Sequence, residues 1–95
     1  MTATAHAEQA QEIRRRAQNR HRNAEELWHL FSHTADPRWQ AQIVDEARHE
    51  DRAAEHLENA AQHHDDEAAA QEILEQEADA RADLNPPPHH NPATQ

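Results

Sequence analysis

Apolar residues recur at alternating spacings of three and four along the first third of the chain, the pattern of a helix that buries one face. One slot of this stripe is polar and is occupied by Arg20. The pattern predicts a helix over residues 4–33, with Thr2 or Thr4 as its N-terminal cap. The apolar members of the stripe are Ala10, Ile13, Ala17, Ala24, Leu27 and Phe31.

A second stripe with the same spacing follows a short polar corner and predicts a helix over residues 37–63. Asp36 and Pro37 are typical of a helix start, because an aspartate side chain accepts a hydrogen bond from the first turn and proline fits the first helical position. Glu50 and His64 occupy the polar slots of this stripe. Its apolar members are Ile43, Ala47, Ala54, Leu57, Ala61 and Ala68.

Folding the two stripes together about the corner predicts an all-α fold, an antiparallel helical hairpin with coiled-coil-like packing. In this register Arg20 lies within about a turn of Glu50. Because alanine dominates both stripes, the two backbones can approach each other closely. The other expected contacts are Phe31 with Ile43, Leu27 with Ala47, Ala17 with Leu57, and Ile13 with Ala61.

The end of the second helix leaves two architectures open. The polar run from His63 to Asp66 can end the helix and cap a third one over residues 66–84, which gives a three-helix bundle. The second helix can instead continue to about Leu84, roughly 70 Å at 1.5 Å per residue. We favour the break, because the three-four pattern loses phase near Ala68. In both cases residues 1–84 form one domain, and residues 85–95, rich in proline and histidine, form a disordered tail.

Large apolar residues gather around the corner between Leu27 and Val44, and Trp28 and Trp39 are expected to close the hairpin there. Leu, Ile, Val and Phe are too few for a self-sufficient core. The helices are therefore expected to complete their burial against another copy of the chain, as a dimer or tetramer, through the alanine-rich stripe and this corner. The expected interaction core is Leu27, Trp28, Phe31, Trp39, Ile43, Val44 and Leu57.

The two parts of the chain differ in charge. Residues 1–35 carry five arginines against four acidic residues, and residues 36–95 carry four arginines against fifteen, within a net charge of −10. We expect the first helix to lie along the acidic second one, whose remaining surface suits a basic protein partner. Cysteine is absent. Since no long apolar run occurs either, we expect a soluble, cytoplasmic protein with no membrane partner.

Two Glu-x-x-His units lie almost symmetrically about the corner of this histidine-rich chain, Glu26 with His29 and Glu46 with His49. The spacing resembles that of ferritin-like bundles, where residues three apart share a helix face and hold a metal. The resemblance implies an iron or zinc site. Glu26, His29 and His49 lie outside the predicted seam, which is the contact between the two apolar stripes, and Glu46 only flanks it. We therefore favour a solvated helix surface with no cofactor.

Five arginines of the first helix form the candidate nucleic-acid site, because arginine contacts phosphates. Glutamates bracket the cluster, and the acidic chain as a whole repels nucleic acid. Pairing with the acidic second helix is therefore the interpretation that we favour. The five residues are Arg14, Arg15, Arg16, Arg20 and Arg22.

No catalytic motif is present. Ser32 is the only serine, it lies in the last turn of a predicted helix, and a chain without glycine has no glycine-rich phosphate loop. A thin hairpin also offers no cleft for paired carboxylates. We expect a non-enzymatic protein-protein interaction module or small regulator, with a metal-binding bundle and a nucleic-acid binder as the alternatives.

Overall fold

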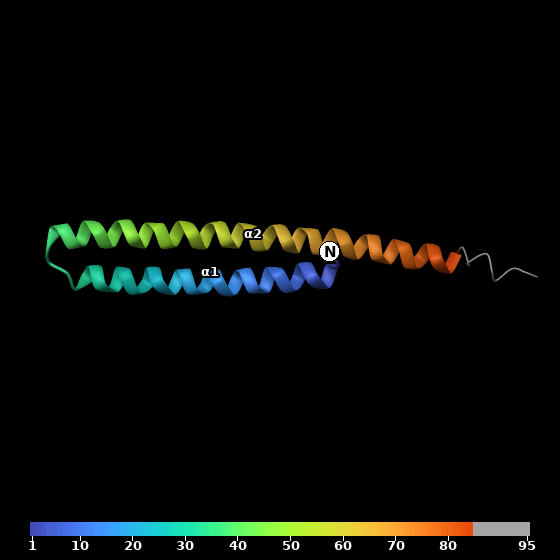
Figure 1. Ribbon diagram of the computed structural model, residues 1–95, viewed down its shortest axis with the longest axis horizontal. Coiled ribbons are helices and arrows are strands. Elements are labelled where there is room, and N and C mark those ends of the chain that lie inside the picture. Colours follow the sequence, from blue (N-terminus) through green and yellow to red (C-terminus); the bar gives the residue numbers. More distant parts are fainter. Residues whose placement is uncertain (85–95) are drawn as a thin grey trace, which may run out of the picture.

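A computed structural model describes residues 1–84, which form two antiparallel helices joined at a corner (Figure 1). Helix α1 spans Ala3–Ser32 and helix α2 spans Pro37–Leu84. The predicted all-α hairpin is confirmed, and the chain does not form a three-helix bundle over residues 1–84. The predicted tail, residues 85–95, lies outside the described residues.

Both helices begin at the predicted caps. The hydroxyl of Thr2 accepts a hydrogen bond from the amide of Ala5 at 3.1 Å. The carboxylate of Asp36 accepts one from the amide of Arg38 at 2.9 Å. Each side chain thus satisfies one of the amides that a helix start leaves without an intrahelical partner.

Side chains also hold the corner. The hydroxyl of Thr34 donates to the carbonyl of Leu30 at 2.7 Å, which closes the last turn of α1. The side-chain amide of Gln40, in the first turn of α2, donates to the carbonyl of Thr34 at 2.7 Å. The corner is therefore tied to both helices.

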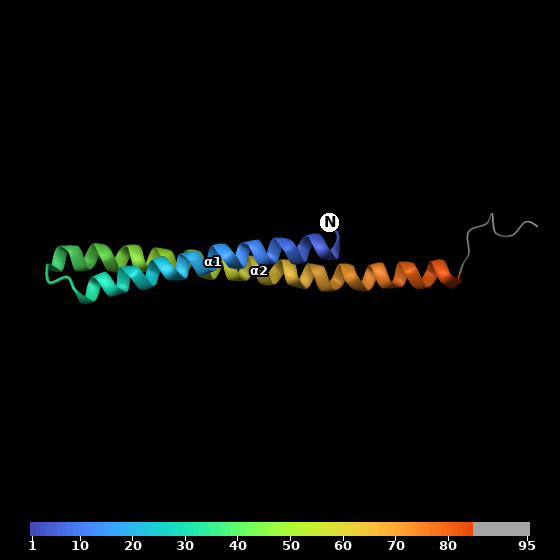
Figure 2. The same ribbon diagram turned by 90° about the horizontal axis from the view of Figure 1, so that it is seen from below.

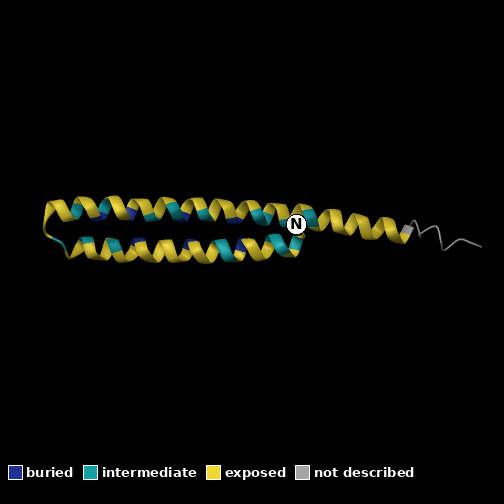
Figure 3. Ribbon diagram, in the orientation of Figure 1, coloured by how far each residue is buried: buried dark blue, intermediate teal, exposed yellow. Residues whose placement is uncertain are grey.

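The core is a seam of alanines between the helices (Figure 3). The seam alanines recur at intervals of seven, which keeps them facing the other helix as the pair coils (Figure 2). Such small side chains fill little volume, so the two backbones lie close together. The buried residues are Ala10, Ala17, Ala24, Ile43, Ala47, Ala54 and Ala61.

The expected break near Asp65 is absent, because α2 continues through it without interruption. Asp65 bonds to Arg14 of α1, and Asp66 accepts a hydrogen bond from the side-chain amide of Gln62 at 3.0 Å. Both aspartates therefore have partners inside a helix, and neither acts as a cap. No glycine or proline interrupts this stretch.

Helix α2 is longer than α1, and its C-terminal turns extend beyond the first turn of α1 (Figures 1 and 2). The amide of Ala3, at the start of α1, donates to the carboxylate of Glu75 at 3.3 Å, and Ala3 also lines a shallow hollow together with Ala68 of α2. The pattern loses phase near Ala68 because the partner helix ends there, not because α2 ends. Over residues 1–84, neither helix has a stretch long and apolar enough to cross a membrane.

Candidate interaction surface

One side of the seam carries two bridges between the helices. Arg14 bonds to Asp65, and His21 bonds to Glu58. Each acidic residue follows a seam alanine by four positions, so both lie on the same side of α2. The Arg14 guanidinium lowers the pKa of Asp65, and Asp65 raises the pKa of Arg14, in both cases chiefly through their hydrogen bond.

A third bridge lies in the seam itself. Arg20 donates from Nη1 to the carboxylate oxygens of Glu50 at 3.0 and 3.2 Å. The predicted proximity of these two residues is confirmed. In all three bridges α1 supplies the basic side chain and α2 the carboxylate, as the uneven charge distribution predicts.

Sequence analysis missed a histidine pair at the open end of the hairpin. The Nδ1 atoms of His6 and His64 lie 3.1 Å apart and the ring centroids 5.3 Å apart, and both side chains are half-buried. His64 was recognised as a polar slot of its stripe. The available signal for His6 is its position, because it precedes Ile13 by one seven-residue repeat.

Four of the five candidate arginines form ion pairs with acidic side chains of the described residues. Arg14 and Arg20 bond to carboxylates of α2. Arg15 and Arg16 reach Glu12 on their own helix, at 2.7 and 3.5 Å. The hydrogen bond from Arg15 is the main cause of the lowered pKa of Glu12.

Of the five candidate nucleic-acid residues, only Arg22 forms no ion pair with another residue between positions 1 and 84. Its side chain is exposed. A single free guanidinium contributes one phosphate contact, which is far fewer than the several contacts that support binding to a duplex.

The four Glu-x-x-His residues, Glu26, His29, Glu46 and His49, are all exposed. In the part of the chain that the structure describes, no three or more histidine and acidic side chains gather where they could hold a metal ion. The imidazole of His29 instead lies beside that of His33, one turn further along α1, with ring centroids 4.5 Å apart.

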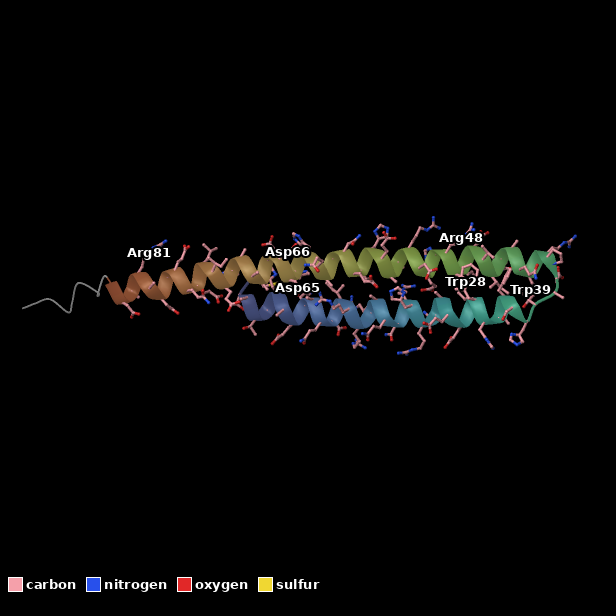
Figure 4. The ribbon with its side chains drawn as sticks, turned by 180° about the vertical axis from the view of Figure 1, so that it is seen from behind. Trp28, Trp39, Arg48, Asp65, Asp66 and Arg81 are labelled. Carbon is pink, nitrogen blue, oxygen red and sulfur yellow. The ribbon has the colours of Figure 1, made fainter. Side chains whose placement is uncertain are left out.

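The large apolar residues of the expected interaction core differ in burial. Ile43 is buried, whereas four others are only half-buried. Trp28 and Trp39 lie near the corner end of the hairpin (Figure 4). They are 38% and 58% exposed, so the expectation that they close the hairpin as buried side chains is wrong. The half-buried residues are Leu27, Phe31, Val44 and Leu57.

The position of each tryptophan explains its exposure. Trp28 is one residue beyond Leu27, and Trp39 is one residue before the half-buried Gln40. One residue turns a helix by about 100°, which moves both indoles from the centre of the seam to its flanks. Trp28 packs edge-on against Phe31, with ring centroids 6.0 Å apart, and leaves the rest of its surface in solvent.

Exposed apolar side chains therefore mark both ends of the hairpin. Leu30 joins the two tryptophans near the corner, and Ile73 and Leu74 lie near the other end of α2. A shallow hollow beside the seam is lined by Leu27, Leu30 and three polar neighbours. Those neighbours are Asn23, Glu26 and Glu50.

Comparison with known proteins finds no counterpart for this arrangement: no protein family, curated protein or solved structure matches the chain.

Proposed function

We propose that this chain is a non-enzymatic helical interaction module that associates with itself. The observation that carries the proposal is the distribution of its apolar residues. Alanine supplies nearly all of the buried seam, while Trp28, Leu30, Trp39, Ile73 and Leu74 are exposed. Burying a large apolar side chain contributes about 1.5–3 kcal/mol, so these residues favour an assembly that covers them.

The shape of the hairpin supports the same proposal. Two helices side by side bury one stripe each, and the remaining faces are open to a further helix. A second hairpin placed alongside completes a four-helix arrangement. A dimer is the simplest such assembly, and a tetramer extends it.

Sedimentation equilibrium of the full chain tests the proposal over a concentration range from micromolar to millimolar. We expect a mass of two or four chains, with a monomer appearing on dilution. A monomer over the whole range would contradict the proposal. Native mass spectrometry of protein purified without a histidine tag gives the same mass and also reports any bound iron or zinc.

A small regulator that binds a basic partner is the second candidate. Three side chains of α1 use only three carboxylates of α2, those of Glu50, Glu58 and Asp65. Among the other acidic residues of α2, Glu67 and Glu77 form ion pairs within the helix, with His63 and Arg81. The rest form no ion pair among residues 1–84 and offer an acidic surface to a partner, and such a complex weakens as salt screens the charges. Binding to a basic protein that is unchanged between low and high ionic strength would count against this candidate.

A further inference from the structure

Helix α2 carries a second row of residues spaced by seven on one flank of the seam, and all of its members except the half-buried Ala53 are exposed. Each member comes one position before a position of the seam, as Ala53 precedes the buried Ala54. The row is thus turned by about 100° from the seam, away from the side that carries the Arg14–Asp65 bridge. Its members are Trp39, Glu46, Ala53, Ala60, Glu67 and Leu74.

Three histidines form a parallel row beside the first one. His49, His56 and His63 are spaced by seven and all are exposed. They alternate with the first row at intervals of three and four residues, and Gln42 and Ala70 continue the pattern at its two ends. The two rows together, here called the histidine stripe, have the spacing of a face that packs against another helix.

Outside the seam, the histidine stripe carries few of the charged residues of α2. Between residues 39 and 74 the helix has ten acidic residues, of which only Glu46 and Glu67 lie on the stripe, and no arginine lies on it. The other eight carboxylates lie in the seam or on other faces. A second acidic helix therefore meets only two carboxylates along this stripe.

The stripe has nearly the same composition when read in either direction from His56. Ala53 and Ala60 lie on either side of the centre, and the large residues Trp39 and Leu74 lie at the ends. Glu46 and Glu67 occupy corresponding positions between them. In a two-fold arrangement about this centre, Ala53 meets Ala60 and Trp39 meets Leu74, so the apolar members of the stripe match each other. Glu46 meets Glu67 in the same arrangement, and this like-charge pair opposes the association.

We propose that α2 of one chain pairs antiparallel with α2 of a second copy through the histidine stripe, with the two-fold axis near His56. This inference rests on the proposed self-association and names its face and orientation. Trp39 of each chain then packs against Leu74 of the other, so that side chains now 58% and 57% exposed cover each other. The turns of α2 beyond α1 lie beside the corner of the other chain, which accounts for the unequal lengths of the two helices.

Distances between spin labels test the orientation, because the chain has no cysteine of its own. Asn59→Cys and Asp45→Cys place a label on an exposed face outside the stripe, near the proposed axis and far from it. At 1.5 Å per residue, the two labels of an antiparallel dimer are offset along the axis by about 8 Å at position 59 and about 35 Å at position 45. We expect a clearly longer distance at position 45.

A charge placed at the centre of the stripe tests the face. Ala60→Glu puts a carboxylate against the second copy and is expected to lower the dimer affinity at least tenfold. Ala41→Glu is the matched control, since Ala41 is also exposed on α2 but lies off the stripe. Circular dichroism shows whether each variant keeps its helices.

The outcomes separate this inference from the function on which it rests. Equal label distances at the two positions, or a dimer that Ala60→Glu weakens no more than Ala41→Glu does, would overturn the inference while leaving self-association in place. A chain that is monomeric at millimolar concentration would overturn both.

Discussion

The guanidinium of Arg20 and the carboxylate of Glu50 meet in the seam between two helices, at 3.0 and 3.2 Å from one nitrogen to the two oxygens. Glu50 is the more buried partner, with 17% of its side chain exposed against 44% for Arg20. The pair occupies slots that apolar residues fill elsewhere in the two stripes. It therefore gives up apolar packing there and fixes the alignment of the helices instead.

Replacing either partner of this pair alone should destabilise the hairpin. Arg20→Leu leaves Glu50 without its partner, and Glu50→Leu does the same to Arg20, so each is expected to lower the free energy of unfolding by about 1 kcal/mol. The double leucine variant makes the seam continuously apolar and should recover that loss or exceed the original stability. Urea unfolding of the four proteins, at one protein concentration, measures the coupling. Single variants as stable as the parent would contradict the assignment of a stabilising pair.

The seam positions, the cap at Asp36 and the Arg20–Glu50 bridge could all be predicted because each depends on local spacing. A three-four pattern states which side of a helix is buried, and two such patterns joined by a short corner leave few ways to fold. The register that pairs Ala17 with Leu57 stays a prediction, although both residues lie between the Arg14–Asp65 and Arg20–Glu50 bridges.

Small side chains in the seam should be essential to the close approach of the helices. Ala54 is fully buried, and Ala54→Leu forces three additional carbons into the seam, with an expected destabilisation of about 1–3 kcal/mol. Ala41→Leu makes the same change at an exposed position of the same helix and should alter stability by less than about 0.5 kcal/mol. Thermal unfolding followed by circular dichroism compares the two. Equal effects would show that the alanine seam is not tightly packed.

The length of α2 and the exposure of the tryptophans could not be predicted in the same way. The three-four apolar pattern of α2 loses phase near Ala68, and either a helix break or the end of a partner helix explains this loss. Only the placement of α1 decides between the two explanations. Trp28 and Trp39 were assigned to the interior because of their size. Their positions, one residue away from Leu27 and Gln40, already placed them off the centre of the seam.

The cap that Asp36 forms at the start of α2 should stabilise the corner. Asp36→Ala removes the acceptor for the amide of Arg38 and is expected to cost about 1 kcal/mol of stability. Asp45→Ala is the control, because Asp45 is exposed in the helix interior. Hydrogen exchange of the first-turn amides of α2 should be faster in the first variant alone. Exchange that is unchanged there would argue against the cap.

The bridge between Arg14 and Asp65 predicts how the stability of the hairpin changes at acid pH. Arg14 lowers the pKa of Asp65 below its ordinary value of 3.8, chiefly through a hydrogen bond, so the carboxylate stays charged in the folded state at pH values where it takes up a proton in the unfolded chain. A lowered folded-state pKa contributes stability above the unfolded value. That stability is lost as the pH falls through the folded value.

Asp65→Asn should therefore be less stable than the parent between pH 7 and about pH 5, by a constant difference that shrinks only below about pH 4. Asp66→Asn is the matched control, because Asp66 accepts its hydrogen bond from the neutral side chain of Gln62. Both variants keep all ten histidines and all other charged residues of the parent, so the comparison concerns one aspartate at a time. Urea unfolding at several pH values gives the differences. An Asp65→Asn effect that stays constant down to pH 2, or that Asp66→Asn reproduces, would show that the Arg14 bridge does not stabilise the hairpin through the charge of Asp65.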